Sequence, residues 1–446
     1  MSSIAANHGR IRLGYSDTTR INPCARKTSP DSVRNNFGSF PSIHSTLDVD
    51  NDVLPTNPLF LDGKNNKLHH TMSTTSSHST TSSTSGTYAL PKLDTPDALP
   101  GDCDVKSYVL NNVTPYHGDD TFLSPPTSRT LKIWNYCEEL MEMERQKGGV
   151  LDVDTKTAST ITSHDAGYIL SKDDDNVIVG LQTDAVLKRS CKPRGGYKVV
   201  KSALQSYGYT PDDNMARTYT DDVETHNDMV FSMYTKEMRK ARHTHLLTGL
   251  PDAYGRGRII GDYRRIPLYG INELIKRKKQ DYDSIKGSSE QVLQLRNEIT
   301  KQVKALNELL KLGDMYDVNM REPAKTFKDA TQYMWLGHVA ALKEQDGAAM
   351  SVGRWDTFLD IYAERDLAEG IATEESLQEI IDNVVIKMRC VRHLRPPAYN
   401  ELFSGDPTWL TVALGGCDEN GNSLVTKTTY RFLHVSTINL RSTMPV

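Results

Sequence analysis

The sequence predicts an α/β protein in which helices outnumber strands. Three observations support this fold class: apolar residues recur every three or four positions across residues 289–312, a second helical pattern starts near Thr373, and the short apolar runs 409–414 and 423–425 flank a turn-rich segment. The first two patterns are typical of amphipathic helices and the third of two strands joined by a loop. The patterns alone leave α+β open as the alternative.

The pattern over residues 289–312 predicts a long amphipathic helix. Ser288 is placed as its N-cap, with Gln291 three residues later as the capping-box partner. The expected apolar face comprises Val292, Leu295, Ile299, Val303, Leu306 and Leu310.

The second helix begins near Thr373 and ends before Pro396 and Pro397. Glu374 and Glu375 fall in its first turn, where carboxylates interact favourably with the helix dipole. Its expected buried face comprises Leu377, Ile381, Val384, Met388 and Val391.

A third helix, near residues 131–147, should end at Gly148 and Gly149, since glycine tolerates the left-handed conformation that commonly ends helices. The runs 409–414 and 423–425 are predicted as strands. The segment between them, 418–422, lacks the length and the closing glutamate of a calcium loop, so it is predicted to be a turn.

Residues 1–104 are predicted to form a disordered leader. Twelve of the thirteen positions from Ser73 to Ser85 are Ser or Thr, and such a segment cannot bury enough apolar surface to offset its ordering entropy. The first 47 residues hold six basic and two acidic side chains, a weak match to an organellar transit peptide. A leader without a targeting role is an equally good interpretation.

Composition argues against several classes of partner and site. The 53 basic and 57 acidic residues give a net charge of −4, which provides no field to gather nucleic acid or anionic lipid. No apolar run approaches the length of about 18 residues that suggests a membrane span. The six cysteines form no CxxC pair, so no zinc site is indicated. We therefore expect an intracellular protein of the cytoplasm, or else of the mitochondrion or plastid.

Four arginines crowd one glycine-rich stretch: Arg256, Arg258, Arg264 and Arg265 lie within ten residues. A guanidinium presents a forked donor face that matches a carboxylate, so binding of a small anion is one interpretation. The alternative is that these arginines form salt bridges with Asp252 and Asp262.

Two other sets of residues suggest chemistry only weakly. Ser163, His164 and Asp165 have the side chains of a hydrolase triad, but adjacent residues are not expected to point at one another in the required order. His243 and His245 are spaced to share a metal ion, yet no third ligand stands nearby. A structural role is favoured for both sets, and no metal site is predicted.

Residues 247–265, reading LTGLPDAYGRGRIIGDYRR, closely resemble the pyruvate formate-lyase family of glycyl-radical enzymes. Nine further blocks resemble this family in the same order: 113–119, 158–168, 179–183, 347–351, 357–360, 364–366, 401–407, 424–427 and 431–433. The resemblance covers residues 105–434 and about the first half of the family's chain. It implies the amino-terminal half of a ten-stranded barrel surrounded by helices, usually homodimeric.

The resemblance also implies a function, formate C-acetyltransferase: reversible cleavage of pyruvate by coenzyme A to acetyl-coenzyme A and formate. By position, Arg258 is similar to the residue that holds the pyruvate carboxylate. Phe403 and Trp409 match aromatic walls of the pocket, and Ala348 matches a small residue that leaves room for substrate. Phe231 falls in a block that resembles the neighbourhood of the coenzyme A site.

The family's reaction requires a glycyl radical, generated by a radical-SAM activating enzyme, and a pair of adjacent cysteines. The 446 residues contain no Cys-Cys pair, and residues 435–446 depart from the family pattern. No catalytic residue is therefore expected in this chain, and a truncated gene model, retained intron or frameshift is our interpretation. The rival hypotheses are a non-catalytic fragment that binds pyruvate or a full-length paralogue, and another glycyl-radical enzyme such as a diol dehydratase.

Overall fold

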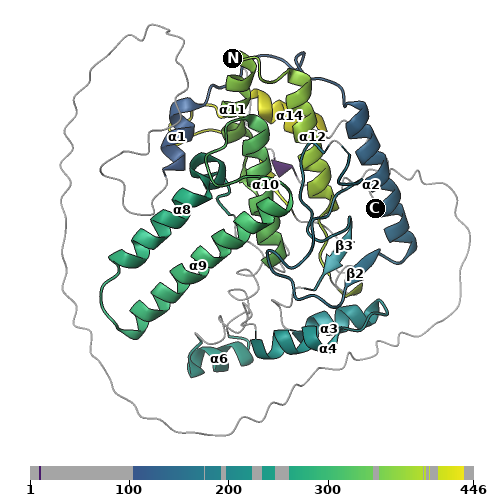
Figure 1. The fold of residues 1–446 in the computed structure, drawn as a ribbon, viewed down its shortest axis with the longest axis vertical. Helices are drawn as coiled ribbons and strands as arrows, with labels where there is room; N and C mark the ends of the chain where they lie inside the picture. Colours follow the sequence, from purple (N-terminus) through teal and green to yellow (C-terminus); the bar gives the residue numbers. More distant parts are fainter. Residues whose placement is uncertain are drawn as a thin grey trace, which may run out of the picture. The chain divides into compact units, whose positions relative to one another are not determined.

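Helices dominate the protein and its strands are short (Figure 1). The computed structural model describes residues 10–11, 104–174, 176–191, 197–222, 234–246, 261–344, 351–394, 396–397, 401 and 410–435. All of them belong to one folded unit, Met1–Asp17 with Tyr88–Val446. The predicted α/β class, rich in helix, is confirmed.

Helix α10 (Phe327–Glu344) is the central helix of this unit. Fourteen of its eighteen residues are buried, which identifies it as a core helix and not a surface one. It packs against α8 (Arg265–Ser284), α9 (Glu290–Met315), α11 (Asp356–Ala368) and α12 (Glu374–Cys390). The main hydrophobic core therefore lies around α10, with these four helices covering it.

Helices α8 and α9 lie side by side as a hairpin (Figure 1). Helix α9 confirms the helix predicted over 289–312, but its N-cap is Ser289, not Ser288. The Ser289 hydroxyl accepts a hydrogen bond from the backbone N–H of Val292. Only part of the predicted apolar face is buried: Ile299 is buried, whereas Leu295 is 50% exposed. The periodicity thus extends beyond the part of α9 that meets the core.

A sharp kink interrupts α8 at Gly270, which adopts φ 69° and ψ 156°. A Cβ atom at this position would lie 2.5 Å from the Arg321 carbonyl oxygen, so a side chain would have to displace backbone. The close approach allows the N–H groups of Ile271 and Asn272 to donate to the carbonyls of Met320 and Arg321. Glycine at this position therefore ties α8 to the segment that leads into α10.

Helix α12 confirms the prediction of a helix starting near Thr373. Thr373 is the N-cap, and its side chain and that of Ser376 form a reciprocal capping box. The five predicted apolar residues are buried, but so are polar residues such as Gln378, Asp382 and Lys387. The expectation of a helix with one solvent-facing side was therefore wrong, because α2 and α14 cover the polar side as well.

Helix α2 (Ser128–Gln146) confirms the helix predicted near residues 131–147. Gly148 and Gly149 follow it with φ of 83° and 98°, as expected for glycines that end a helix. Near its end the buried Glu144 accepts hydrogen bonds from Arg189 Nη2 at 3.0 Å and Arg392 Nε at 2.8 Å. A carboxylate of α2 thus meets two cations from distant parts of the chain.

The strands form two small sheets. Strand β2 (Asp152–Asp154) pairs in parallel with β3 (Lys188–Ser190). In the other sheet, β5 (Val412–Ala413) lies between β1 (Arg10–Ile11), which is antiparallel to it, and β4 (Gly353–Arg354), which is parallel. These strands of the described residues do not by themselves outline the expected half of a ten-stranded barrel.

The predicted pair of carboxyl-terminal strands is only partly present. Strand β5 lies within the predicted run 409–414, but residues 423–425 form no strand and contribute one bridge, from Ser423 to Cys417. The predicted turn is confirmed, since the Asp418 carboxylate accepts the N–H groups of Asn420 and Asn422, each at 2.8 Å. The difference arises because β5 pairs with β4, a distant partner that the local pattern does not reveal.

The remaining described helices surround this framework. They are α1 (Val105–Asn112), α3 (Tyr197–Ser206), α4 (Asp213–Arg217), the π-helical turn η2 (Thr218–Asp222), α6 (Lys236–His243) and α14 (Lys427–Val435). A second, smaller core gathers beside β2 and β3 from Val150, Val153, Cys191, Val200, Leu204, Met215 and Tyr219.

The predicted leader, residues 1–104, lies outside the described residues except for β1 and Asp104. Asp104 caps α1, with its side chain accepting the N–H of Ser107 at 2.8 Å. The predicted divergent tail, residues 435–446, is likewise outside them apart from Val435. Within the described ranges, no helix combines the length and the hydropathy needed to cross a membrane.

We predict that Glu144→Gln lowers the free energy of unfolding by about 3–5 kcal/mol, because Arg189 and Arg392 would lose their buried counter-charge. The control is Glu142→Gln, which removes an exposed ion pair to Arg145 on the same helix and should cost less than about 1 kcal/mol. Urea unfolding followed by circular dichroism measures both. Equal, small losses of unfolding free energy in both variants would show that Glu144 does not anchor α2 to Arg189 and Arg392.

A second prediction concerns Asp382, where burial raises the carboxyl pKa from 3.8 to about 7. Between these values the folded state retains a proton that the unfolded state releases, so stability falls as the pH rises through this window. Asp382→Asn should therefore raise the free energy of unfolding at pH 8, by about 1–3 kcal/mol. The gain should vanish below about pH 4, where both states are protonated. A gain for Asp382→Asn that stays constant across this pH range would contradict the argument.

Candidate functional site

The residues predicted for the substrate pocket lie outside the described residues. They are Arg258, Ala348, Phe403 and Trp409, with Phe231 predicted near coenzyme A. The described residues that border these segments can nevertheless be located. They show which of the predicted segments begin or end near one another.

Strands β4 and β5 bring the described residues that follow two of these segments to the same sheet edge. Ala348 lies five residues before β4, and Trp409 lies three residues before β5. Because the two strands are parallel, their amino-terminal ends lie at one edge of the sheet. The N–H of Val352 donates to the Thr411 carbonyl at 3.0 Å, which extends the pairing towards that edge. The described residues that follow the two predicted pocket segments therefore lie side by side at this edge.

Tyr263 anchors the end of the arginine segment beside β4. Its buried ring packs edge-on against Trp355, the residue after β4, with ring centroids 6.4 Å apart. Its hydroxyl oxygen lies 3.2 Å from Nδ1 of His338 in α10. Burial raises the pKa of the Tyr263 hydroxyl to about 12, so this group stays protonated at neutral pH. The border of the segment with Arg258 is thus fixed beside Trp355, at the carboxyl end of β4.

Ion pairs account for two of the four crowded arginines. Asp262 lies 2.8 Å from Arg264 Nε and 3.6 Å from Arg265 Nε. The salt-bridge interpretation is therefore correct for these two, and the prediction of anion binding rests on Arg256 and Arg258, which lie outside the described residues.

The segment after β5 is fastened to helix α11. The buried Asp356 carboxylate accepts the N–H of Gly415 at 2.7 Å and the hydroxyl of Thr429 at 2.5 Å. Asp360, one turn later, accepts the N–H of Thr428 at 2.8 Å. Burial raises the pKa of both carboxyl groups, and the hydrogen bonds they accept oppose that shift. These hydrogen bonds therefore hold the chain that follows β5 against α11.

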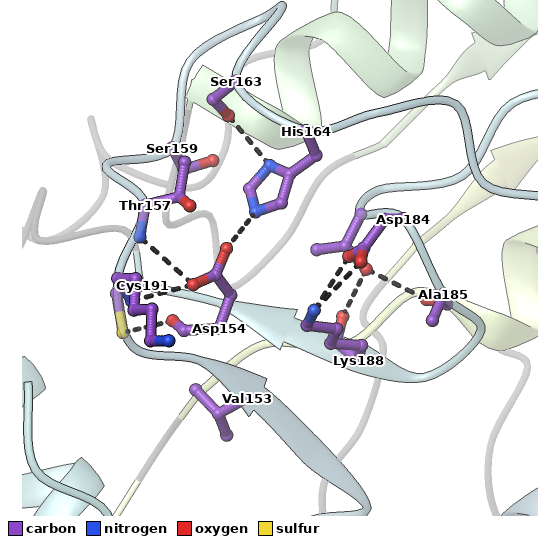
Figure 2. A network of polar contacts seen from close by, with 12 residues as sticks. Val153, Asp154, Thr157, Ser159, Ser163, His164, Asp184, Ala185, Lys188 and Cys191 are labelled. Carbon is purple, nitrogen blue, oxygen red and sulfur yellow. Dashed lines mark hydrogen bonds and ion pairs between the residues drawn. The ribbon is translucent and has the colours of Figure 1, made fainter.

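Figure 2 shows a polar network between the end of β2 and the loop that follows it. Ser163 Oγ lies 2.8 Å from His164 Nδ1, and His164 Nε2 lies 3.0 Å from Asp154 Oδ2. Ser163 and His164 do contact, but Asp165 is exposed and takes no part in this arrangement, so the three adjacent residues do not form a triad. The carboxylate in the arrangement is Asp154, ten positions before His164, and no local pattern links the two.

The network is better suited to holding a turn than to hydrolysis. Ser163 Oγ already accepts the N–H of Thr160 and lies 3.0 Å from the Thr160 carbonyl. Burial, aided by the positive charge of Lys343, lowers the pKa of His164, which favours the neutral imidazole. The ring nitrogens contact serine and aspartate in the reverse of the arrangement in serine hydrolases, where Nε2 faces the serine.

Lys343 places a buried cation directly before the segment that contains Ala348. It is 2% exposed, and burial lowers the pKa of its ammonium to about 8 while the charge of Asp184 opposes that shift. Asp184 also pairs with Lys188 at 3.0 Å. Sequence reasoning missed Lys343, since a single lysine near the end of an apolar helix resembles a surface residue.

Helix α6 follows the segment that contains Phe231 and has no buried residue. It carries five basic side chains: Lys236, Arg239, Lys240, Arg242 and His243. His243 and His245, for which a structural role was favoured over metal binding, belong to no group of three potential metal ligands among the described residues. The helix is instead a strongly basic surface element.

Residues 101–446 match a protein-family model described as pyruvate formate lyase-like. The chain is also 45% identical over 336 residues to formate acetyltransferase 1 of Escherichia coli (strain K12). This match covers 74% of the present chain and 44% of the relative, so the chain spans less than half the length of that protein.

Two solved structures concerned with dehydration have a similar fold. The glycerol-bound, B12-independent glycerol dehydratase of Clostridium butyricum matches with a TM-score of 0.53 and 17% identity, over 71% of this chain and 46% of the dehydratase. A protein of 1,2-propanediol dehydration in Roseburia inulinivorans matches with a TM-score of 0.51 and 18% identity, over 72% and 46% of the two chains. At this identity the likeness concerns the fold alone. The family model and the 45% identity together show that the chain belongs to the pyruvate formate lyase-like family.

Proposed function

We propose that this chain forms the pyruvate- and coenzyme A-binding part of a formate C-acetyltransferase, which converts pyruvate and coenzyme A to acetyl-coenzyme A and formate. The observation that carries this proposal is the 45% identity to formate acetyltransferase 1 over 336 residues. The glycerol and propanediol dehydratases share only 17–18% identity with the chain, which favours the acyltransferase over a dehydratase.

Pyruvate would bind where the predicted segments converge. Arg258 would hold its carboxylate through forked hydrogen bonds, since an unpaired buried carboxylate is costly. Ala348 would leave room for the substrate, and Phe403 and Trp409 would form apolar walls. The shared edge of β4 and β5 supports this arrangement, because it brings together the borders of the segments with Ala348 and Trp409. Tyr263, beyond the segment with Arg258, packs at the other end of β4.

Coenzyme A would lie near Phe231 and α6. Its phosphate groups carry several negative charges, which the exposed basic side chains of α6 would attract. The aromatic ring of Phe231 would offer a surface to the adenine or the pantetheine arm. No metal or further cofactor is part of this proposal.

The radical chemistry would depend on polypeptide other than these 446 residues. The family's reaction needs a radical glycine and two adjacent cysteines, and this sequence contains no Cys-Cys pair. These groups would come from further chain or from a full-length paralogue in a dimer, activated by a radical-SAM enzyme. We propose a location inside the cell, in the cytoplasm or otherwise in a mitochondrion or plastid.

The alternative is a non-catalytic protein that binds pyruvate or a full-length subunit. The genomic sequence beyond the codon for Val446 separates the two proposals. An open continuation that encodes Cys-Cys and the radical glycine supports the enzyme, and its absence supports the binding protein.

For pyruvate, we predict that Arg258→Lys weakens binding to the purified chain by roughly 10- to 100-fold, because lysine offers a point charge in place of two parallel donors. Isothermal titration calorimetry measures the change. Arg256→Lys, two residues earlier in the same stretch, is the matched control and should change the affinity less than about twofold. A larger loss for Arg256→Lys would move the carboxylate site to that arginine, and wild-type chain that binds no pyruvate would refute the proposed site.

For coenzyme A, we predict that Lys240→Glu weakens binding by about two- to fivefold, the effect of one exposed charge interaction. The effect should shrink as the salt concentration rises, because exposed charges are screened. Lys301→Glu makes the same charge change on the exposed side of α9 and should leave the affinity unchanged. Equal effects of both variants would indicate a general charge effect and no site at α6.

A further inference from the structure

Residues 157–164, which follow β2, clasp the carboxyl-terminal end of α10. The Ser159 hydroxyl donates to the Lys343 carbonyl at 2.6 Å, and the N–H of Ile161 donates to Glu344 Oε1 at 3.1 Å. The last carbonyls of a helix have no partner within the helix, so a hydroxyl from another segment satisfies one of them here. We call residues 157–164 the clasp.

The clasp also joins α10 to the smaller core beside β2 and β3. The N–H of Ser159 donates to the Tyr219 hydroxyl at 2.8 Å, and that hydroxyl donates to the Cys191 carbonyl at 2.7 Å. Tyr219 and Cys191 belong to the smaller core, whereas Ile161 of the clasp is buried in the main core. The clasp therefore connects the two cores at the end of α10.

His164 holds the two ends of the clasp together (Figure 2). Its side chain is 3% exposed, with Nδ1 2.8 Å from Ser163 Oγ and Nε2 3.0 Å from Asp154 Oδ2. The other carboxylate oxygen of Asp154 accepts the N–H groups of Lys156 and Thr157 at 2.8 and 3.1 Å. One contact between an imidazole and a carboxylate thus links the last residue of the clasp to its first.

The protonation state of His164 decides how the Ser163 hydroxyl is used. A carboxylate only accepts hydrogen bonds, so the neutral ring is assigned a proton on Nε2, and its Nδ1 accepts from Ser163. In the imidazolium both nitrogens carry protons, and the Ser163 hydroxyl then donates only to the Thr160 carbonyl, 3.0 Å away. Protonation thus reverses one hydrogen bond of the clasp and brings a positive charge into an interior that excludes water.

We propose that the clasp is a pH-sensitive device, closed on α10 while His164 is neutral and loosened when acid protonates this ring. The charged groups that face the ring are Asp154 of β2, Asp184 of the loop before β3 and Lys343 of α10. The device is independent of the proposed acyltransferase function, because none of its residues belongs to the predicted pyruvate or coenzyme A sites.

Acid loosens the clasp because the closed form binds this proton less readily than the open form. Burial, aided by the charge of Lys343, lowers the pKa of His164 from 6.5, and the charges of Asp154 and Asp184 oppose that shift. The stability that the neutral ring contributes is therefore present above pH 6.5 and lost as the pH falls towards the lowered value. Loosening would release the last turn of α10, which precedes the segment with Ala348 in sequence.

Hydrogen–deuterium exchange of the folded 446-residue chain tests this device, with each rate corrected for the intrinsic exchange rate at the same pH. Peptides from residues 157–164 and 338–344 should lose protection between about pH 7.5 and about pH 5. The loss should reach up to about tenfold for each unit by which the pKa of His164 is lowered. Residues 327–335, in the first half of α10, are the internal reference and should keep their protection.

His164→Asn cannot take up the proton and should show the same clasp protection at both pH values. His117→Asn replaces an exposed histidine outside the clasp and should retain the wild-type loss of protection. Thermal melting shows whether each variant is folded. An NMR titration of the His164 ring in the wild-type chain gives a second measurement that needs no variant.

Three outcomes would each overturn the proposal. The wild-type clasp could keep its protection at about pH 5, or folded His164→Asn could lose protection in acid as the wild type does. The NMR titration could also place the pKa of His164 at or above its ordinary value of 6.5, in which case acid would not favour the open clasp.

Discussion

The fold depends on one buried carboxylate that faces two cations. Glu144, at the end of α2, binds Arg189 of β3 and Arg392 beyond α12, which lie 45 and 248 positions away in sequence. None of the three charges would be stable in this interior without the others. Burying an isolated charge costs several kcal/mol, because the charge loses its hydration. Helix α2, strand β3 and the exit of α12 must therefore reach their final positions together. Backbone carbonyls complete the arrangement: Arg189 also donates to the carbonyls of Gly149 and His393.

The pairing of Glu144 with Arg392 also positions the chain that leads to the candidate site. Arg392 is where the polypeptide leaves α12 on its way to the predicted pocket residues Phe403 and Trp409, and β5 follows them. On the far side, Asp356 fastens the segment after β5 to α11. Both borders of the predicted aromatic wall are thus held by buried charge. Rigid borders matter at a binding site because substrate affinity falls when binding must first order the groups that make it.

The helices could be predicted from sequence because their signals are local. Thr373 and the glycines after α2 lie within a turn of the ends they mark, and periodicity extends over a single element. The features that the sequence did not predict all depend on contacts between residues that are not neighbours in sequence. They are the pairing of β5 with β4, the burial of the polar side of α12, and the contact of Asp154 with His164. The pocket residues came from family resemblance alone, since a phenylalanine or alanine has no sequence signature that separates a binding wall from ordinary core. The physical chemistry of the arginine stretch left anion binding and salt bridges as alternatives, and the structure shows salt bridges from Arg264 and Arg265 to Asp262.

Helix α2 meets the exit of α12 at Glu144, which pairs with Arg392, two residues beyond the end of α12. The ionic contact is strong only while water is excluded from it, because its attraction weakens in a medium of higher dielectric constant. The ion pairs of Glu144 with Arg189 and Arg392 thus secure the point where the chain leaves α12 towards the predicted pocket.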